Sequence, residues 1–120
     1  MDINDYYWHD KILLNIFVDR KTPGIIDEVS FEIEDEGLLK KLTFSEVYHL
    51  KLHMNFGIVA EESINSIRYL PEDDEDLLWL YRKWKGSLHE KRLLSYAIEL
   101  NSTGGIIKLI AGKFTYRNAD

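Results

Sequence analysis

The sequence has no cysteine, and this absence excludes disulfide bonds, thiolate-bound metal clusters and a cysteine nucleophile. It has only two prolines, and no apolar run approaches the ~18 residues that would span a bilayer. Basic residues are also scarce: 15 Lys and Arg stand against 21 Asp and Glu, which leaves a net charge of −6. Because nucleic-acid binding depends on basic side chains that neutralise phosphates, we expect no nucleic-acid partner.

The sequence also lacks the signatures of common enzymes. It holds no glycine-rich phosphate loop, no Gly-x-Ser-x-Gly nucleophile elbow and no pair of carboxylates in a plausible catalytic arrangement. We therefore expect no catalytic residue, no cofactor and no enzymatic activity. The first residues, Met1–Asp5, are acidic where a secretory signal would be basic, so we expect a cytoplasmic protein with no membrane anchor.

The composition is that of one globular domain. Of the 120 residues, 45% are hydrophobic and 12% aromatic. A chain of this length buries roughly 65% of its unfolded surface, which is enough for a core that forms without a partner. We find no internal repeat, no low-complexity tract and no linker, and we therefore predict a single domain over residues 1–120.

The first part of the chain shows the period-two alternation of β-strands. Residues 12–18 are apolar on both faces near the start of the segment, which indicates a strand that is central or covered. A proline–glycine turn at 23–24 then leads into residues 26–34, where apolar side chains alternate with acidic or polar ones. This second segment predicts an antiparallel strand with one buried face and one solvated, acidic face that carries Glu32 and Glu34.

Further strands are expected after a turn at residues 35–37. We predict one at 40–44, a second at 47–56 and a shorter one between Ile64 and Tyr69. Segment 47–56 also fits a helical stripe in part, but the longer period-two pattern favours a strand. The polar face of that strand would carry His49, Lys51, His53 and Asn55.

One helix is predicted near residues 72–85. Pro71 would sit at its opening, and the acidic run Glu72–Asp76 would complement the positive end of the helix dipole. Basic residues up to Lys85 would complement the other end, before Gly86 ends the helix. The apolar stripe that would pack on the sheet consists of Leu77, Leu80, Tyr81 and Trp84.

The last third of the chain predicts a β-hairpin. Its strands cover 94–100 and 106–116, and Gly112 would mark a bulge or a bend. All the segments together predict an α+β, mainly β fold. We expect an antiparallel sheet of six to seven strands, curved or barrel-like, with the helix packed on it and inserted before the last hairpin.

Histidines offer two candidate sites. His9-Asp10 follows three aromatic residues, and a histidine held by a carboxylate can act as a base or a metal ligand, but adjacent side chains of an extended chain point to opposite faces. We interpret this pair as a cap at the start of the first strand, with Asp10 bonded to local amides and His9 tucked under the aromatics. His49 and His53 would stand ~13 Å apart on a strand, too far for one ion, so we expect no metal.

Two acidic surfaces are candidate binding sites for a basic protein. The run Glu72–Asp76 lacks the alternating acids and the glycine of an EF-hand loop, so we assign it to helix capping, solvation and the docking of a basic partner. Trp79 lies opposite the line from Leu77 to Trp84 and is the tryptophan best placed for contact. The predicted partner-binding residues are Asp73, Asp74, Glu75, Trp79, Glu32 and Glu34.

Four short features support a resemblance to a known group of proteins. They are Trp8-His9-Asp10 before a strand, Asp19-Arg20, Pro23-Gly24 and Asn55-Phe56-Gly57-Ile58. In these features the chain resembles small β-rich bacterial proteins with an aromatic-His-Asp opening, many without an assigned function and some classed as immunity proteins of polymorphic toxin systems. The resemblance implies an intracellular, non-catalytic binding protein in which the Trp-His-Asp triplet defines the fold, and it carries over no catalytic residue.

We therefore expect a cytoplasmic, non-catalytic protein-binding module whose acidic surface meets a basic partner, which the resemblance implies is a toxin domain. Two alternatives stay open. One is a small-ligand carrier or an enzyme, with a pocket on a curved sheet lined by Tyr96, Tyr116 and His9. The other is a homodimer of unknown role, built by the pairing of edge strands.

Overall fold

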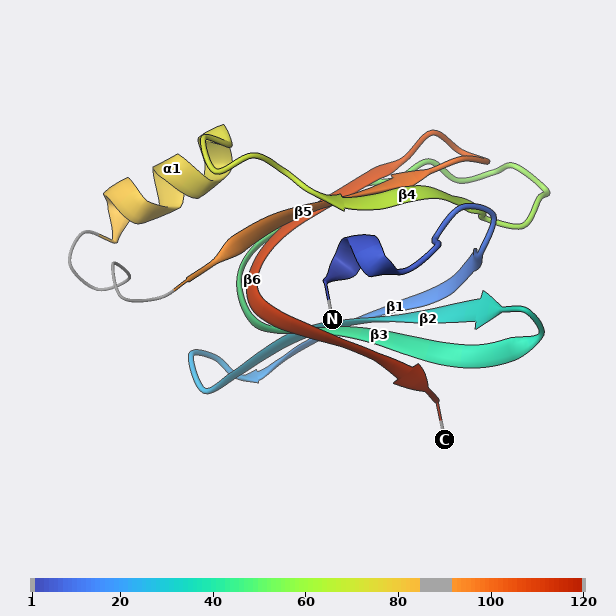
Figure 1. The fold of residues 1–120 in the computed structure, drawn as a ribbon, viewed down its shortest axis with the longest axis horizontal. Helices are drawn as coiled ribbons and strands as arrows, with labels where there is room; N and C mark the ends of the chain where they lie inside the picture. The colour runs from blue at the N-terminus through green and yellow to red at the C-terminus, as the bar shows by residue number, and fades with distance from the viewer. Residues whose placement is uncertain (1, 85–91, 120) are drawn as a thin grey trace.

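A single curved sheet dominates the computed structural model, which describes residues 2–84 and 92–119. Within these residues, six antiparallel strands follow the order β1-β2-β3-β6-β5-β4, accompanied by one 3-10 turn and one α-helix (Figure 1). This is the predicted mainly β architecture, with the helix inserted before the last hairpin. The elements are η1 (Ile3–Asp5), β1 (Ile12–Thr22), β2 (Ile26–Asp35), β3 (Leu38–His53), β4 (Ile64–Tyr69), α1 (Glu75–Lys83), β5 (Leu94–Leu100) and β6 (Ile106–Asn118).

The strands predicted at 40–44 and 47–56 are two halves of one long strand, β3, which ends at His53. The register of β3 with β6 shifts between Val47 and His49, and Glu46 adopts a φ of +55°. Opposite this bulge, a Cβ on Gly112 would come within 2.7 Å of a Glu46 carboxylate oxygen, so a larger residue would require the Glu46 side chain to move. Because a bulge bends the strands that carry it, Gly112 marks the predicted bend, and the described sheet has six of the predicted six to seven strands.

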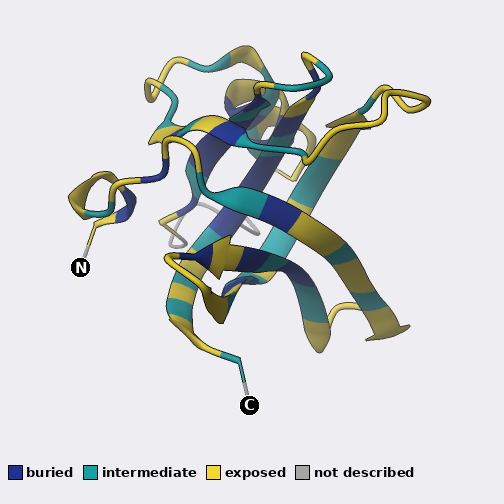
Figure 2. Ribbon diagram, turned by 90° about the vertical axis from the view of Figure 1, so that its right-hand side faces the viewer, coloured by how far each residue is buried: buried dark blue, intermediate teal, exposed yellow. Residues whose placement is uncertain are grey.

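The bend folds the sheet over its own inner face, where the core lies. Figure 1 shows β1, β2 and the first half of β3 facing β4 and β5, with η1 between them. Burial is concentrated along the middle of the strands, and the loops are exposed (Figure 2). Fully buried side chains on this inner face include Phe31, Ile33, Leu42, Phe44, Tyr96, Ile107 and Leu109.

The segment before β1 fills the open side of this core. Trp8 is buried, its indole N–H donates to the Ile3 carbonyl oxygen at 2.8 Å, and its ring centroid lies 4.7 Å from that of Tyr116. His9 is exposed, with its ring centroid 6.3 Å from that of the exposed Tyr7, so the prediction that it tucks under the aromatics is wrong. The Asp10 backbone N–H donates to the Ile64 carbonyl oxygen at 2.9 Å, but its carboxylate lies 3.5 Å from His9 Nε2 instead of binding local amides as predicted. The two side chains come together because residues 9–10 form a turn, in which Asp10 adopts a φ of +69°, and not an extended strand.

β1 lies at the edge of the sheet and not in the central or covered position that its sequence predicts. Only its first residues meet the opposite end of the sheet, through a bridge between Ile12 and Ser63. The two edges then separate, so the described sheet curves without closing on itself.

The helix differs from its prediction at both ends. Pro71 is not at its opening: Asp74 is the N-cap, and its carboxylate accepts the Leu77 N–H at 3.2 Å. The predicted end at Lys85 and Gly86 lies outside the described residues. No helix in the described ranges combines the length and the apolar composition needed to cross a membrane.

Trp84 does not extend the buried stripe of α1 as predicted. It follows the last helical residue and is 49% exposed. Only Leu77 and Leu80 are fully buried, against Leu93 and Ile110 of the sheet side. The helix therefore rests on the sheet by its first two turns.

Candidate protein-binding surface

Two acids of the predicted run face the sheet and hold α1 on it. Lys108 Nζ lies 2.5 Å from Asp74 Oδ1 and 2.7 Å from Asp76 Oδ2. Ser95 Oγ donates to Asp74 Oδ2 at 3.1 Å, and Lys51 Nζ donates to Asp76 Oδ2 at 3.0 Å. These carboxylates are therefore engaged inside the molecule. Asp74, predicted to bind a partner, serves here as a helix cap and an internal ion-pair member.

The pKa values of this cluster are set by burial and by its hydrogen bonds. Desolvation raises the pKa of Asp74, but hydrogen bonds from Lys108, the Leu77 N–H and Ser95 outweigh it, and the net pKa is lowered. A hydrogen bond from Lys108 is the main cause of the lowered pKa of Asp76. Desolvation lowers the pKa of Lys108, yet its two aspartate partners raise it overall. All three side chains are therefore charged at neutral pH.

We expect the protein to lose stability in acid. The folded-state pKa values of Asp35, Asp74 and Asp76 lie below the ordinary value of 3.8, so the folded state binds protons less readily than the unfolded chain does. Their contribution is complete above the unfolded pKa and is lost as the pH falls through the folded pKa. Urea unfolding at pH 7, 5, 4 and 3 should show a free energy of unfolding that decreases below about pH 5. A free energy that stays constant down to pH 3 would contradict this.

The other acids of the run face solvent together with an aromatic side chain. Glu72, Asp73 and Glu75 are exposed and pair with no basic side chain among the described residues. Trp79 is 47% exposed and Leu78 43%. We call these five residues the helix surface. Asp73, Glu75 and Trp79, three of the predicted partner-binding residues, are thus exposed at or near α1.

Glu32 and Glu34 lie elsewhere and do not join the helix surface. Figure 1 shows the end of β2 on the side of the molecule away from α1. Asn15 Nδ2 donates to Glu32 Oε1 at 2.7 Å, and Lys41 is the register partner of Glu32 on β3. The next strand continues this row with Arg117. The outer face of β2 is therefore acidic only on its own strand, because neighbouring strands supply amide and basic side chains.

The predicted polar face of β3 is divided by α1. His49 is partly buried beside the start of the helix, where its Nε2 is 3.9 Å from Asp76 Oδ2. His53 and Lys51 are exposed, and the Lys51 side chain, 57% exposed, reaches Asp76 from the surface. Neighbouring residues cannot reveal this cover, because it depends on where α1 docks. Among the described residues, no cluster of three or more His, Cys, Asp or Glu side chains is arranged to hold a metal ion.

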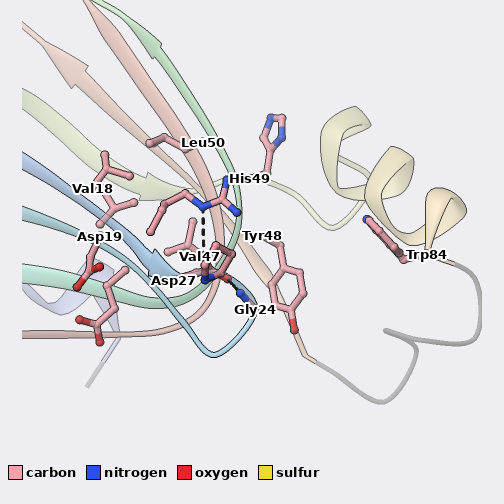
Figure 3. A pocket seen from close by; sticks show the side chains of 13 residues that line it. Val18, Asp19, Gly24, Asp27, Val47, Tyr48, His49, Leu50 and Trp84 are labelled. Atoms are coloured by element: carbon pink, nitrogen blue, oxygen red, sulfur yellow. Dashed lines mark hydrogen bonds and ion pairs between the residues drawn. The ribbon is translucent and has the colours of Figure 1, made fainter.

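A groove of about 730 Å³ runs between the β1–β2 hairpin, the bend of β3 and the end of α1 (Figure 3). On the hairpin side, Asp27 Oδ2 accepts the Gly24 N–H at 2.9 Å, and Oδ1 lies 3.4 Å from Arg20 Nε. On the helix side, His49 points toward α1. Asp27 Oδ1 and His49 Nε2 are buried and form no hydrogen bond with another described residue. Each lies within ion-pair distance of a different residue, Arg20 for Asp27 and Asp76 for His49.

The residues of the predicted ligand pocket are found in the core or at the surface. Tyr96 is buried, and the hydroxyl of Tyr116 donates to Asp35 Oδ2 at 2.8 Å beneath the ring of Trp8. His9 is exposed, with Nδ1 3.2 Å from the Asn65 carbonyl oxygen. Tyr96 and Tyr116 are thus side chains of the core, and His9 is a side chain of the surface.

Sequence reasoning missed a second exposed surface, beside β1. A groove of about 520 Å³ separates this strand from the segment that follows β3. The signal for it was present, because β1 reads as apolar on both faces. Side chains that line this groove include Leu14, Ile16, Val18, Leu52, Met54, Phe56 and Ile58.

Comparison with known proteins assigns neither a family nor a function to this chain. The chain matches no family model, no curated protein and no solved structure. Its function is therefore argued from its own surfaces.

Proposed function

We propose that this protein is a non-catalytic protein-binding module whose helix surface captures a basic protein partner. The observation that supports the proposal is that the acids of the run Glu72–Asp76 have two different environments. Asp74 and Asp76 anchor α1 through Lys108, while Glu72, Asp73 and Glu75 are exposed, as is Trp79, and form no ion pair with any other described residue. The surface is therefore both charged and held in place before a partner arrives.

The composition of the helix surface suits such a partner. Tryptophan is enriched among the residues that dominate binding energy at protein interfaces, and a rim of unpaired acids attracts lysine and arginine side chains. The excess of acidic residues over the whole chain extends this attraction to longer range, where salt screens it. In this proposal the protein acts in the cytoplasm, and the resemblance described above implies a toxin domain as the partner.

Removing the free charges should slow the capture of the partner without unfolding the domain. We expect the triple variant Glu72→Gln, Asp73→Asn, Glu75→Gln to reduce the association rate roughly tenfold at low salt, with a smaller difference at high salt. Asp74 is left unchanged because it caps α1 and pairs with Lys108. The measurement is surface plasmon resonance with the partner that the wild-type chain captures from its host, at several salt concentrations.

A variant of equal charge change provides the control. Glu32→Gln, Glu34→Gln, Glu36→Gln also removes three negative charges, but from β2 and the turn after it, away from the helix surface. It should change the association rate much less. If the β2 variant slows association and the helix variant does not, the binding surface has been assigned to the wrong face.

A further inference from the structure

The outer edge of β1 offers backbone groups that the described chain does not use. Along this edge, the Leu13 N–H donates to the Glu62 carbonyl oxygen at 2.8 Å, and the Lys11 carbonyl oxygen accepts the Ile64 N–H at 2.7 Å. From Leu14 onward, β1 pairs only with β2 among the described residues. An open edge of this kind is a template for another strand.

The side chains on this edge are those of a covered strand. Leu14, Phe17 and Val18 are 48%, 50% and 49% exposed. Natural edge strands are usually protected by lysine, proline or an inward-pointing charge, and the first charged residue after Leu14 is Asp19. The stretch from Leu14 to Val18 therefore has the apolar sequence of a strand with neighbours on both sides, although its outer edge pairs with no strand among the described residues.

The groove beside β1 provides room for a further strand. Its far wall carries Leu52, Met54, Phe56 and Ile58, so apolar side chains from an added strand would meet apolar side chains there. Phe56 is 85% exposed and Ile58 55%. Both would lose solvent contact when the groove is filled.

We propose that the occupant is β1 of a second copy of this chain, paired antiparallel across a two-fold axis at Phe17. In this register Phe17 lies opposite its own counterpart, Ile16 lies opposite Val18, and Asn15 lies opposite Asp19. Each apolar side chain meets an apolar one, and the Asp19 carboxylate meets the Asn15 amide. The same patch then serves both copies, as an isologous interface requires.

Other registers fit less well. A shift of two residues in one direction pairs Phe17 with the polar Asn15 and places Asp19 opposite the apolar Leu13. The same shift in the other direction places Asp19 opposite Phe17. Registers displaced by one residue are excluded because they reverse the faces of all side chains.

Charge complementarity also favours a second copy as the occupant. The strand ends near the exposed Lys21, and the segment beside its start carries the exposed Glu61. Their neighbours are already engaged, since Arg20 pairs with Asp27 and the Glu62 carboxylate accepts hydrogen bonds from Thr103. Antiparallel pairing brings Lys21 of each copy toward Glu61 of the other. These attractions occur twice in the dimer because of its symmetry.

The oligomeric state in solution tests this proposal. The interface involves one strand and one groove, which places it among weak, concentration-dependent dimers. Sedimentation of the full chain from 1 to 500 µM should show roughly a doubling of the mass from 14.2 kDa as the concentration rises. Val18→Lys, which places a charge at the paired edge, should remain monomeric over this range with an unchanged far-UV spectrum. A wild-type chain that stays monomeric, or a Val18→Lys variant that still dimerises, would overturn the proposal.

Crosslinking tests the register. The native chain has no cysteine, so Phe17→Cys introduces a single thiol at the axis. Directly opposite residues on antiparallel strands place their Cβ atoms roughly 5 Å apart, close enough for a disulfide after a small adjustment. We expect Phe17→Cys to form a covalent dimer at least tenfold faster than Phe56→Cys, although Phe56 is the more exposed position. Equal rates would show that random collision is responsible and would reject the proposed axis.

The two proposals can fail separately. Val18→Lys should leave the capture of the basic partner unchanged, because the helix surface lies on α1. The helix triple variant should leave the mass of the chain unchanged at every concentration.

Discussion

Replacing Asp35 by alanine is expected to lower the free energy of unfolding by about 3–5 kcal/mol, because a buried charge cluster would lose its central member. The Asp35 side chain is 9% exposed, and Lys11 Nζ lies 2.8 Å from Oδ1. Its Oδ2 accepts the Tyr116 hydroxyl at 2.8 Å and lies 3.3 Å from Lys40 Nζ. Urea unfolding followed by circular dichroism measures the difference.

The large effect follows from what the substitution leaves behind. Two lysines would remain with most of their surface buried and with no carboxylate between them, and the Tyr116 hydroxyl would lose its acceptor. Desolvation opposes the ionised form of Asp35, but hydrogen bonds from Lys11, Tyr116 and Lys40 outweigh it and lower the pKa of Asp35. Burial, followed by the hydrogen bond to Asp35, raises the pKa of Tyr116. The cluster thus joins the segment before β1 to the ends of β2, β3 and β6.

Two variants calibrate this result. Glu34→Ala removes an exposed acid one residue away and should change stability by no more than about 0.5 kcal/mol. Tyr116→Phe removes one of the three hydrogen bonds to Asp35 and should cost about 1–3 kcal/mol. If Asp35→Ala destabilises no more than Glu34→Ala does, the cluster does not stabilise the fold.

A second large effect is expected for Lys108→Met, which should lower the free energy of unfolding by about 3 kcal/mol. The substitution keeps the length of the side chain but leaves Asp74 with no basic partner among the described residues, and Asp76 with Lys51 and the more distant His49. The partly buried Asp74 carboxylate would then lie between α1 and the sheet without the lysine that compensates its charge. We expect α1 to detach before the sheet unfolds.

Comparing two signals detects this detachment. Trp79 and Trp84 report on α1 by fluorescence, the buried Trp8 adds a signal from the core, and far-UV circular dichroism reports mainly on the strands. The fluorescence of the variant should therefore show an early transition that the circular dichroism lacks. Lys113→Met, at an exposed position of the same strand, is the matched control and should unfold like the wild type. The double variant Asp74→Asn, Lys108→Met should be less destabilised than the sum of its single variants, because the two residues interact directly. Additive effects would show that the ion pair contributes little.

Local patterns were sufficient to predict most of the secondary structure. The alternation of apolar and polar residues in 26–34 and in the last hairpin predicts β-strands, because one face of each strand is apolar. The turn at Glu36-Gly37 was also predictable, since both residues adopt positive φ there. The segment 40–53 was harder: its two halves alternate separately, and the bulge at Glu46 that joins them has no local signature.

The candidate binding surface was only partly predictable for a related reason. From the sequence alone, Asp73, Asp74 and Glu75 all look like exposed acids near the start of a helix, and nothing distinguishes an ion-paired acid from an exposed one. Which of them is free depends on Lys108, which lies 34 positions further along the chain than Asp74. The cluster around Asp35 was missed altogether, because its four members are brought together only by the order of the strands.

The sequence by itself determined the strand and helix types, the hairpin turns and the excess of acidic surface, since these depend on residues that are neighbours along the chain. Only the tertiary structure decided that β1 lies at an edge, that α1 partly covers His49, and that Trp8 fills the core while Trp84 stays exposed. The physical reason is that burial and ion pairing depend on distances between elements. Those distances are set by how the sheet curves around its inner face.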